Sequence, residues 1–394
     1  MQYFFILGKN PILSKTEIEA VLEFKEYRIK NIEFGGNVLV LEAEKKLDID
    51  WLNNCLGGTV KIGKILDKIS DLENFEKRFF DLIKFEEGKV YFGFSLYSLD
   101  PKVHLKHLTN KLTPVAMEIK RKLREEKNLN SRYVVSKELE LSSVIVKKNK
   151  LLANGAEICF MVKPNEILVG QTLAVQPFGE FGQRDFTRPS RDELSGMLPP
   201  KLARIMVNLA QLKKGAIILD PFCGSGTILQ EALLLGHDNL IASDKNPKAI
   251  NDTQNNLNWL ASKYGLNTNN VQLFTLPIEH LTREIKPSSI DAIITEPYLG
   301  PALKGNEGLK QINLIIKELE TLYLSAFNVF TKILKSQGKM VIISPIFRYN
   351  NSNLRLAILD KIEKLGFNIL NKEDLIYFRP KQFIWREILI LEKE

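Results

Sequence analysis

The stretch Asp220-Pro221-Phe222-Cys223-Gly224-Ser225-Gly226-Thr227 decides the fold of the second half of the chain. An apolar run at 216–219 precedes it, and an apolar helical pattern follows it as far as Gly236. Glycines in a strand-to-helix turn let the backbone approach a ligand closely, and the helix N-terminus presents free N–H groups. The stretch therefore predicts a ligand site in an α/β sheet of alternating strands and helices.

Two acidic residues narrow the identity of that ligand. Asp220 ends one predicted strand, and Asp244 ends the next one. An acid in the second place holds ribose hydroxyls in doubly wound nucleotide sites. Leu229 replaces the third glycine of a dinucleotide fingerprint, and no Walker pattern is present, so the residues argue against a pyrophosphate or ATP. A ligand with a ribose and no phosphate, S-adenosylmethionine, fits best; the alternative is a plain strand–turn–helix connection.

A second motif, Thr295-Glu296-Pro297-Tyr298, closes the predicted strand 292–295, the fourth strand of this sheet in chain order. Exocyclic amines of bases are poor nucleophiles because their lone pair is delocalised into the ring. A site that methylates one must accept the hydrogen bonds of the amine. Thr295 or Glu296 could supply one acceptor, the Glu296 and Pro297 carbonyls the second, and Tyr298 a stacking face. The alternative, a strand end blocked by proline, stays open.

The net charge of +8 over 394 residues is concentrated in one region. Residues 101–150 hold 13 Lys and Arg against 5 Asp and Glu, so the rest of the chain is neutral in sum. A confined positive field suits a polyanion such as RNA or DNA. The solvated face of an amphipathic helix explains it equally well.

Composition and cysteine usage exclude several classes of protein. No apolar run approaches the roughly 18 residues that span a bilayer, and no basic region precedes the apolar start, so neither a membrane span nor a secretory signal is expected. Three widely spaced cysteines fit a reducing cytoplasm. The four histidines form no ligand cluster with cysteine or carboxylate, so we expect no catalytic metal.

Four segments are predicted along the chain. Residues 1–70 read as β-α-β-β-α-β, a ferredoxin-like arrangement, with a capping box at Ser14–Glu17 opening the first helix. Residues 71–177 form a second α+β domain with a basic helix from Lys102 and a strand at 143–147. A Gly-, Pro- and charge-rich linker, 178–197, leads to a Rossmann-like domain, 198–394, whose last two strands are antiparallel.

The run Gln183-Arg-Asp-Phe-Thr-Arg-Pro189, followed by Ser195-Gly-Met-Leu-Pro-Pro-Lys-Leu-Ala-Arg204, resembles the THUMP-containing tRNA guanine-N2 methyltransferases, and the run at 220–227 resembles the cofactor motif of amino-methyltransferases. The resemblance covers essentially the whole chain; it is strongest from 183 to 244 and only architectural before Lys89. It implies a ferredoxin-like domain, a THUMP-like RNA-binding domain and a Rossmann-like catalytic domain.

The same resemblance assigns roles to residues of this chain. Asp244 would hold the ribose of the methyl donor, and the motif 295–298 would hold the target base. The family usually has Asp/Asn-Pro-Pro-Tyr/Phe at the second motif, so Thr295-Glu296-Pro297-Tyr298 departs from the pattern. Phe222 is counted with the cofactor loop, although we expect its ring to pack in the core. The residues expected around the donor are Asp220, Phe222, Gly224, Gly226 and Thr227.

The function expected from these features is methylation of the exocyclic N2 of a guanosine in tRNA. Two alternatives remain: methylation of adenine N6 in DNA or RNA, and a non-catalytic tRNA-binding protein that keeps the fold. Arg184, Arg188 and Arg191 are expected either to contact RNA phosphates or to brace the linker. The sequence leaves open a small activating subunit, the target nucleotide, mono- or dimethylation, and the oligomeric state.

Overall fold

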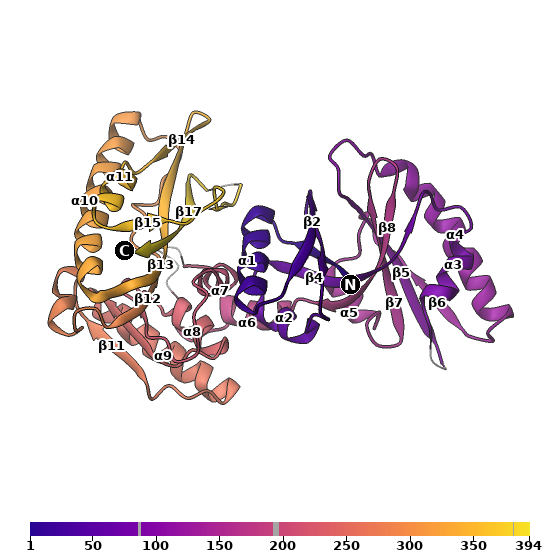
Figure 1. Cartoon of the computed structure of the whole chain (residues 1–394), viewed down its shortest axis with the longest axis horizontal. Coiled ribbons are helices and arrows are strands. Elements are labelled where there is room, and N and C mark those ends of the chain that lie inside the picture. Colours follow the sequence, from indigo (N-terminus) through magenta and orange to yellow (C-terminus); the bar gives the residue numbers. More distant parts are fainter. Residues whose placement is uncertain (86–87, 192–196, 381) are drawn as a thin grey trace. The chain divides into compact units, whose positions relative to one another are not determined.

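The computed structural model describes residues 1–85, 88–191, 197–380 and 382–394 (Figure 1). The chain forms two compact units. Unit 1 contains Met1–Lys15 and Leu22–Phe178, and unit 2 contains Thr16–Val21 and Gly179–Glu394. Each unit is built around a sheet of its own, one with eight strands and one with nine.

The amino-terminal part of unit 1 has the predicted ferredoxin-like order. Its elements are β1 (Gln2–Leu7), α1 (Pro11–Phe24), β2 (Ile29–Gly35), β3 (Val38–Ala43), α2 (Ile49–Cys55) and β4 (Thr59–Ile69). The strands lie in the order β2-β3-β1-β4, with β1 antiparallel to both of its neighbours. This part of the fold prediction is confirmed.

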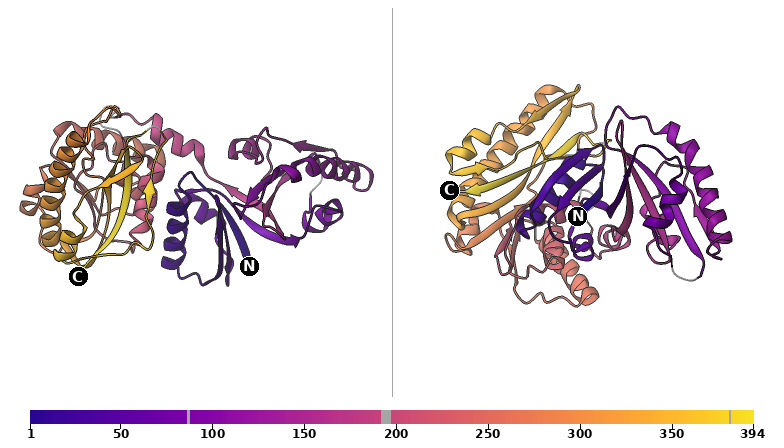
Figure 2. Two further views of the ribbon diagram at one scale, coloured as in Figure 1. Left: turned by 90° about the horizontal axis from the view of Figure 1, so that it is seen from above. Right: turned by 45° about the vertical axis from the view of Figure 1, so that its right-hand side comes forward.

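The rest of unit 1 extends the same sheet. Its elements are α3 (Phe75–Leu82), β5 (Val90–Ser98), α4 (Lys106–Glu125), β6 (Ser131–Val134), α5 (Ser143–Lys148), β7 (Gly155–Val162) and β8 (Ile167–Val175). Pairing of β4 with β8 makes the eight strands continuous. Helices α3 and α4 bury their apolar sides against the β5–β7–β8 part of it (Figure 2). The division of this unit at residue 70 stays a prediction.

Three local predictions in unit 1 are wrong. Residues 143–147 are helical in α5, because Ser142 caps the helix by accepting a hydrogen bond from the Ile145 N–H and Val146 fills the core. Helix α1 begins at Pro11, so Ser14 lies inside it and bonds the Asn10 carbonyl. Proline suits the first helical position, where no N–H partner is needed. The basic helix begins at Lys106, not Lys102.

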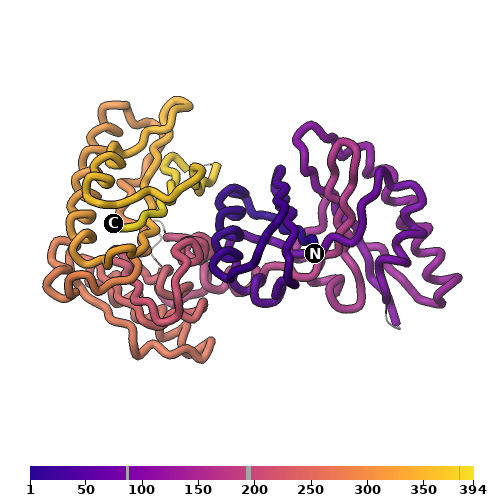
Figure 3. The backbone as a smooth tube through the Cα atoms, in the orientation of Figure 1, coloured from indigo at the N-terminus to yellow at the C-terminus, as the bar shows by residue number. Residues whose placement is uncertain are grey.

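Unit 2 has the predicted alternation of strands and helices (Figure 3). Its helices are α6 (Phe178–Phe186), α7 (Pro200–Leu209), α8 (Thr227–Leu234), α9 (Pro247–Tyr264), η1 (Ile278–Arg283), α10 (Leu309–Ile333) and α11 (Leu359–Lys364). Its strands are β9 (Ile218–Asp220), β10 (Leu240–Asp244), β11 (Val271–Thr275), β12 (Ile290–Thr295), β13 (Leu334–Tyr349), β14 (Ser352–Arg355), β15 (Phe367–Ile369), β16 (Ile376–Tyr377) and β17 (Ile384–Lys393).

The sheet of unit 2 explains where the two motifs meet. Its order is β11-β10-β9-β12-β13-β17-β15, parallel from β11 to β13 and antiparallel at β17. The Rossmann-like fold and the antiparallel pairing of the last two predicted strands, β16 and β17, are thereby confirmed. Helix α10 runs along one face of the sheet and α7 and α8 along the other (Figure 1). Strand β9 lies between β10 and β12, so the carboxyl ends of all three share one edge.

The predicted linker is partly a folded element. Helix α6 occupies 178–186, and its Phe181 and Arg184 are buried. Glycine and charge in this stretch suggested irregular structure, but burial of one helix face outweighs weak helix propensity. Residues 192–196 of the predicted linker lie outside the described residues.

Candidate active site

The glycine-rich loop joins β9 to α8. Gly224 and Gly226 have φ of +51° and +76°, in the left-handed region that favours glycine. The Gly224 N–H donates to Asp244 Oδ2 at 3.2 Å, which ties the loop to the end of β10. Among the described residues, no atom beyond the chain neighbours lies within 4 Å of where a Cβ of Gly224 would stand. That side of the loop backbone is therefore open to a ligand.

Two polar residues of α9, Thr253 and Asn256, donate hydrogen bonds to carbonyl groups of the glycine-rich loop. Neither was predicted from the sequence. The Thr253 hydroxyl donates to the Gly224 carbonyl at 2.8 Å. The Asn256 amide donates to the Ser225 carbonyl at 2.9 Å and to the Ser190 carbonyl at 3.0 Å. Both side chains are fully buried. In the sequence, Thr253 and Asn256 have the spacing of polar residues on the exposed face of a helix. Their role in holding the loop therefore had no local sequence signal.

Asp244 is held ready to accept further hydrogen bonds. Besides the Gly224 N–H, its carboxylate accepts the Asn246 N–H on Oδ1 at 2.9 Å. The side chain is half-buried, and each oxygen keeps a second lone pair. Asn246 in turn caps α9 by accepting the Lys248 N–H. This geometry suits a carboxylate that binds hydroxyl groups.

Asp220 links the two motifs. Its buried carboxylate accepts the Thr295 hydroxyl at 2.7 Å and the Phe222 N–H at 3.3 Å, both on Oδ1. Burial raises the pKa of Asp220 to about 7, and the nearby Asp244 and Glu296 carboxylates add to the rise. The half-buried Phe222 ring packs against the core of the sheet, as expected.

The raised pKa predicts how stability depends on pH. The folded state keeps the Asp220 proton up to about pH 7, whereas an ordinary aspartate releases it near 3.8. Between these values the folded state binds more protons, so its stability falls as pH rises and then levels off. We expect the melting temperature of the wild type, relative to Asp220→Asn, to decline from about pH 4 to about pH 7. Parallel melting curves over that range would contradict the assignment.

The second motif is joined to the carboxyl-terminal strand by an ion pair. Arg386 on β17 donates from Nε to Glu296 Oε1 at 2.5 Å, and both side chains are largely buried. Burial raises the pKa of Glu296, although the Arg386 guanidinium opposes that rise. Oε2 of Glu296 has no hydrogen-bond partner among the described residues. Arg386 could not be predicted as the partner of Glu296, because the two residues are 90 positions apart.

The other two residues of the motif differ in exposure. Pro297 is buried, whereas Tyr298 leaves 57% of its surface exposed. The Thr295 hydroxyl donates to Asp220, and its side chain is fully buried. The groups at this edge that could meet a ligand are therefore the outer oxygen of Glu296, the backbone carbonyls and the Tyr298 ring.

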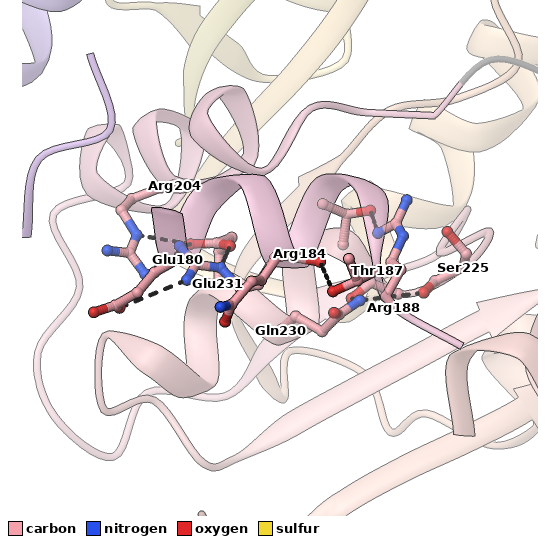
Figure 4. A network of polar contacts seen from close by, with 11 residues as sticks. Glu180, Arg184, Thr187, Arg188, Arg204, Ser225, Gln230 and Glu231 are labelled. Carbon is pink, nitrogen blue, oxygen red and sulfur yellow. Dashed lines mark hydrogen bonds and ion pairs between the residues drawn. The ribbon is translucent and has the colours of Figure 1, made fainter. Parts of the chain in front are cut away.

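A buried charge cluster anchors α6 to the helix that follows the glycine loop (Figure 4). Glu231 on α8 accepts Arg184 Nε of α6 on Oε1 at 2.6 Å and Arg204 Nε of α7 on Oε2 at 2.7 Å. The Phe181 ring centre lies 4.5 Å and 5.0 Å from the two guanidinium carbons. Arg184 is 2% exposed. Of the two roles expected for Arg184, bracing of the protein is the one observed.

The segment after α6 reaches the start of α8. Arg188, labelled in Figure 4, donates from Nη1 to the Thr227 hydroxyl at 2.7 Å. Its side chain is 3% exposed. Ser190 and Asn256 exchange two hydrogen bonds across the same place. Arg188 is thus also a bracing residue. Arg191 is exposed and lies over the Phe186 ring.

The described part of the chain contains neither a membrane-spanning helix nor a cluster of metal ligands. Of its helices, none is long and apolar enough to pass through a bilayer. Within the same ranges, His, Cys, Asp and Glu side chains do not gather in groups of three or more that could hold a metal ion.

Comparison with known proteins identifies the relatives of the chain. A family described as "RMKL-like, methyltransferase domain" matches residues 188–364, and one described as "DNA methylase" matches 68–255. The tRNA (guanine(10)-N2)-dimethyltransferase of Methanocaldococcus jannaschii is 30% identical over 53% of this chain and 56% of its own length. The tRNA (guanine(6)-N(2))-methyltransferase THUMP3 of Mus musculus is 28% identical over 36% of this chain and 28% of its own. The chain thus spans about half the length of the first of these relatives, and less of the second.

A solved structure supports the same fold. TrmN from Thermus thermophilus aligns over 100% of both chains with a TM-score of 0.57 and 16% identity. At that identity the likeness concerns the fold alone. In sequence the chain is similar to tRNA guanine-N2 methyltransferases over part of their length, and a methyltransferase-domain model matches its second half.

Proposed function

We propose that this protein transfers a methyl group from S-adenosylmethionine to the exocyclic N2 of a guanosine in tRNA. The observation that carries the proposal is the meeting of two sites at one sheet edge, where the Thr295 hydroxyl donates to Asp220 at 2.7 Å. A loop open to a ligand thus lies beside a motif with a base-stacking ring. The names of the sequence relatives support guanosine N2 and tRNA as the target.

The residues of the glycine loop fit the cofactor. Gly224, Gly226 and Thr227 would surround it with backbone N–H groups at the start of α8, and Asp244 would accept the ribose hydroxyls. Asp220 would hold the start of the loop through the Phe222 N–H, and the Phe222 ring would pack against the core of the sheet. Bound S-adenosylmethionine supplies an already activated methyl group, so the chain chiefly has to align the two reactants.

The residues of the second motif would hold the guanine. Tyr298 offers an exposed ring on which the base can stack. Oε2 of Glu296 and the backbone carbonyls beside Pro297 would accept the hydrogen bonds of the amine, while Arg386 keeps the Glu296 side chain in place. The target guanosine has to leave its stack to reach this edge.

Gly226→Ala tests the cofactor loop. A Cβ at Gly226 would stand 2.8 Å from Thr253 Cγ2, and its φ is +76°. The loop must shift, so we expect affinity for S-adenosylhomocysteine, measured by calorimetry, to fall about tenfold or more. Gly236→Ala is the matched control, since Gly236 also has a positive φ (+87°) but no crowding at the other end of α8. Equal affinity of both variants and the wild type would count against the assigned site.

The function itself is tested by nucleoside mass spectrometry. Unmodified tRNA, ribosomal RNA and duplex DNA are each incubated with the purified chain and S-adenosylmethionine. We expect N2-methylguanosine in the tRNA alone, and the spectra separate one methyl group from two. Because only this chain is present, formation of the product would show that no further subunit is required. Absence of new methylguanosine overturns the proposal.

The same assay also tests two alternative functions, each of which is favoured by one observation. The match to a DNA methylase family over 68–255 favours a test for N6-methyladenine in the DNA and RNA arms. The Thr295 hydroxyl, tied to Asp220 at the first position of the motif, favours a test for tRNA binding without transfer. If the chain binds tRNA at saturating cofactor but forms no methylated product, it is a non-catalytic tRNA-binding protein.

The compartment proposed for this reaction is the cytoplasm. The buried Cys159 and Cys223 form no disulfide, which suits a reducing environment.

A further inference from the structure

The carboxyl-terminal strands of unit 2 carry an aromatic cluster that the proposed reaction does not use. The Phe378 and Trp385 rings lie 4.8 Å apart and tilted by 31°, and the Arg348 guanidinium carbon is 4.6 Å from the Trp385 ring centre. Phe383, just before β17, is 40% exposed, and Phe378 is 39% exposed. We call Arg348, Phe378, Phe383 and Trp385 the terminal aromatic surface.

Exposed aromatic rings are few in the described part of unit 2. They are Phe186, Tyr298, Phe378 and Phe383. Two of the four belong to the terminal aromatic surface, and a third is the ring of the target-base motif. Large exposed rings cost solvation free energy unless something covers them, so the presence of two of them on the carboxyl-terminal strands points to a binding surface.

Two contacts relate this surface to the target-base motif through neighbouring residues. Arg386, next to Trp385 on β17, pairs with Glu296. Gly305, in the segment after Tyr298, lies against Phe383; a Cβ there would stand 2.3 Å from the ring. Successive strand side chains alternate, so Trp385 and Arg386 point to opposite faces of β17. The same strand end therefore carries the aromatic stack on one face and the partner of Glu296 on the other.

The chemistry of the surface fits unpaired nucleotides. Bases stack on aromatic rings and on guanidinium planes whatever their sequence, and arginine also meets the phosphates. Arg379 adds an exposed guanidinium beside Phe378, with its Nε donating to the Tyr377 hydroxyl at 3.2 Å. A protein partner would be expected to meet an apolar patch, whereas these rings are interleaved with arginine.

We propose that the terminal aromatic surface stacks the unpaired nucleotides that flank the target nucleotide in the RNA. The inference rests on the proposed function for its choice of RNA as partner. Removing a base from its stack exposes the faces of its neighbours, and rings at the end of β17 that also carries the partner of Glu296 would cover those faces. The surface thereby favours targets in single-stranded or opened segments over intact helices.

Binding of short RNAs to the full chain tests this proposal. The probes are a dye-labelled single strand of about eight nucleotides without self-pairing and a blunt duplex of the same sequence, at one fixed salt concentration. Phe383→Leu and Phe378→Leu keep apolar bulk and remove the ring. Phe186→Leu is the matched control, because Phe186 is 65% exposed but lies on α6. Melting temperatures establish that all variants are folded.

We expect each of the two surface variants to bind the single strand about tenfold more weakly, with the duplex and the control unchanged. With Trp51 and Trp259 replaced by phenylalanine, the single strand should also quench the fluorescence of Trp385. Wild-type affinity in both surface variants overturns the proposal, as does failure of the wild type to bind the single strand. Methyl transfer is scored separately, so a chain that binds through these rings without methylating tRNA refutes only the proposed function.

Discussion

Replacing Glu231 with glutamine is expected to lower the stability of unit 2 by about 3–5 kcal/mol, the typical cost of leaving buried charges unpaired. Glu231 is 0% exposed, and both of its oxygens accept from arginine. Glutamine keeps the volume but leaves the Arg184 and Arg204 guanidinium groups facing a neutral amide. The melting transition of this unit should fall by about 10 °C, measured by calorimetry.

Glu180→Gln is the matched control for this prediction. Glu180 lies 4.0 Å from Arg184 but is 56% exposed (Figure 4), so solvent screens its charge and we expect a change of about 0–1 kcal/mol. Adding Arg184→Met to Glu231→Gln removes one unpaired charge and should recover part of the loss. If Glu231→Gln and Glu180→Gln melt alike, the cluster does not anchor α6 as described.

Glu296→Gln is expected to lower methyl transfer to tRNA by about 100-fold, within the range usual for loss of a proton acceptor. The substitution preserves shape and one hydrogen bond to Arg386 but removes the negative charge that would attract the amine protons. Affinity for S-adenosylhomocysteine should stay unchanged, since Glu296 belongs to the second motif and not to the glycine loop. Single-turnover rates with tRNA provide the measurement.

Glu387→Gln serves as the control for Glu296→Gln. Glu387 is also a largely buried carboxylate on the same part of the sheet, paired with Arg355 at 2.9 Å, and burial raises its pKa as well. Loss of this charge should leave the rate nearly unchanged. A Glu296→Gln variant that transfers methyl groups at the wild-type rate would falsify the acceptor role, and the backbone carbonyls would then have to suffice.

Local sequence determined the elements of the site but not their partners. Strand ends at Asp220, Asp244 and Thr295 follow from apolar runs that stop at polar residues, and the glycines mark the turn. Their meeting at one edge follows from the parallel order of the sheet. The strand predicted at 143–147 failed because a run of β-branched residues suits a buried helix face as well as a strand.

By itself, the sequence determined the α/β class, the ferredoxin-like order, the glycine loop and the position of the second motif. Only the tertiary structure decided how those residues are held: Arg386 beside Glu296, Glu231 between Arg184 and Arg204, and Asn256 beneath the loop. The physical reason is that periodicity reports which face of an element is buried, whereas a buried charge or amide needs a specific partner. That partner is chosen by the packing of elements far apart in the chain.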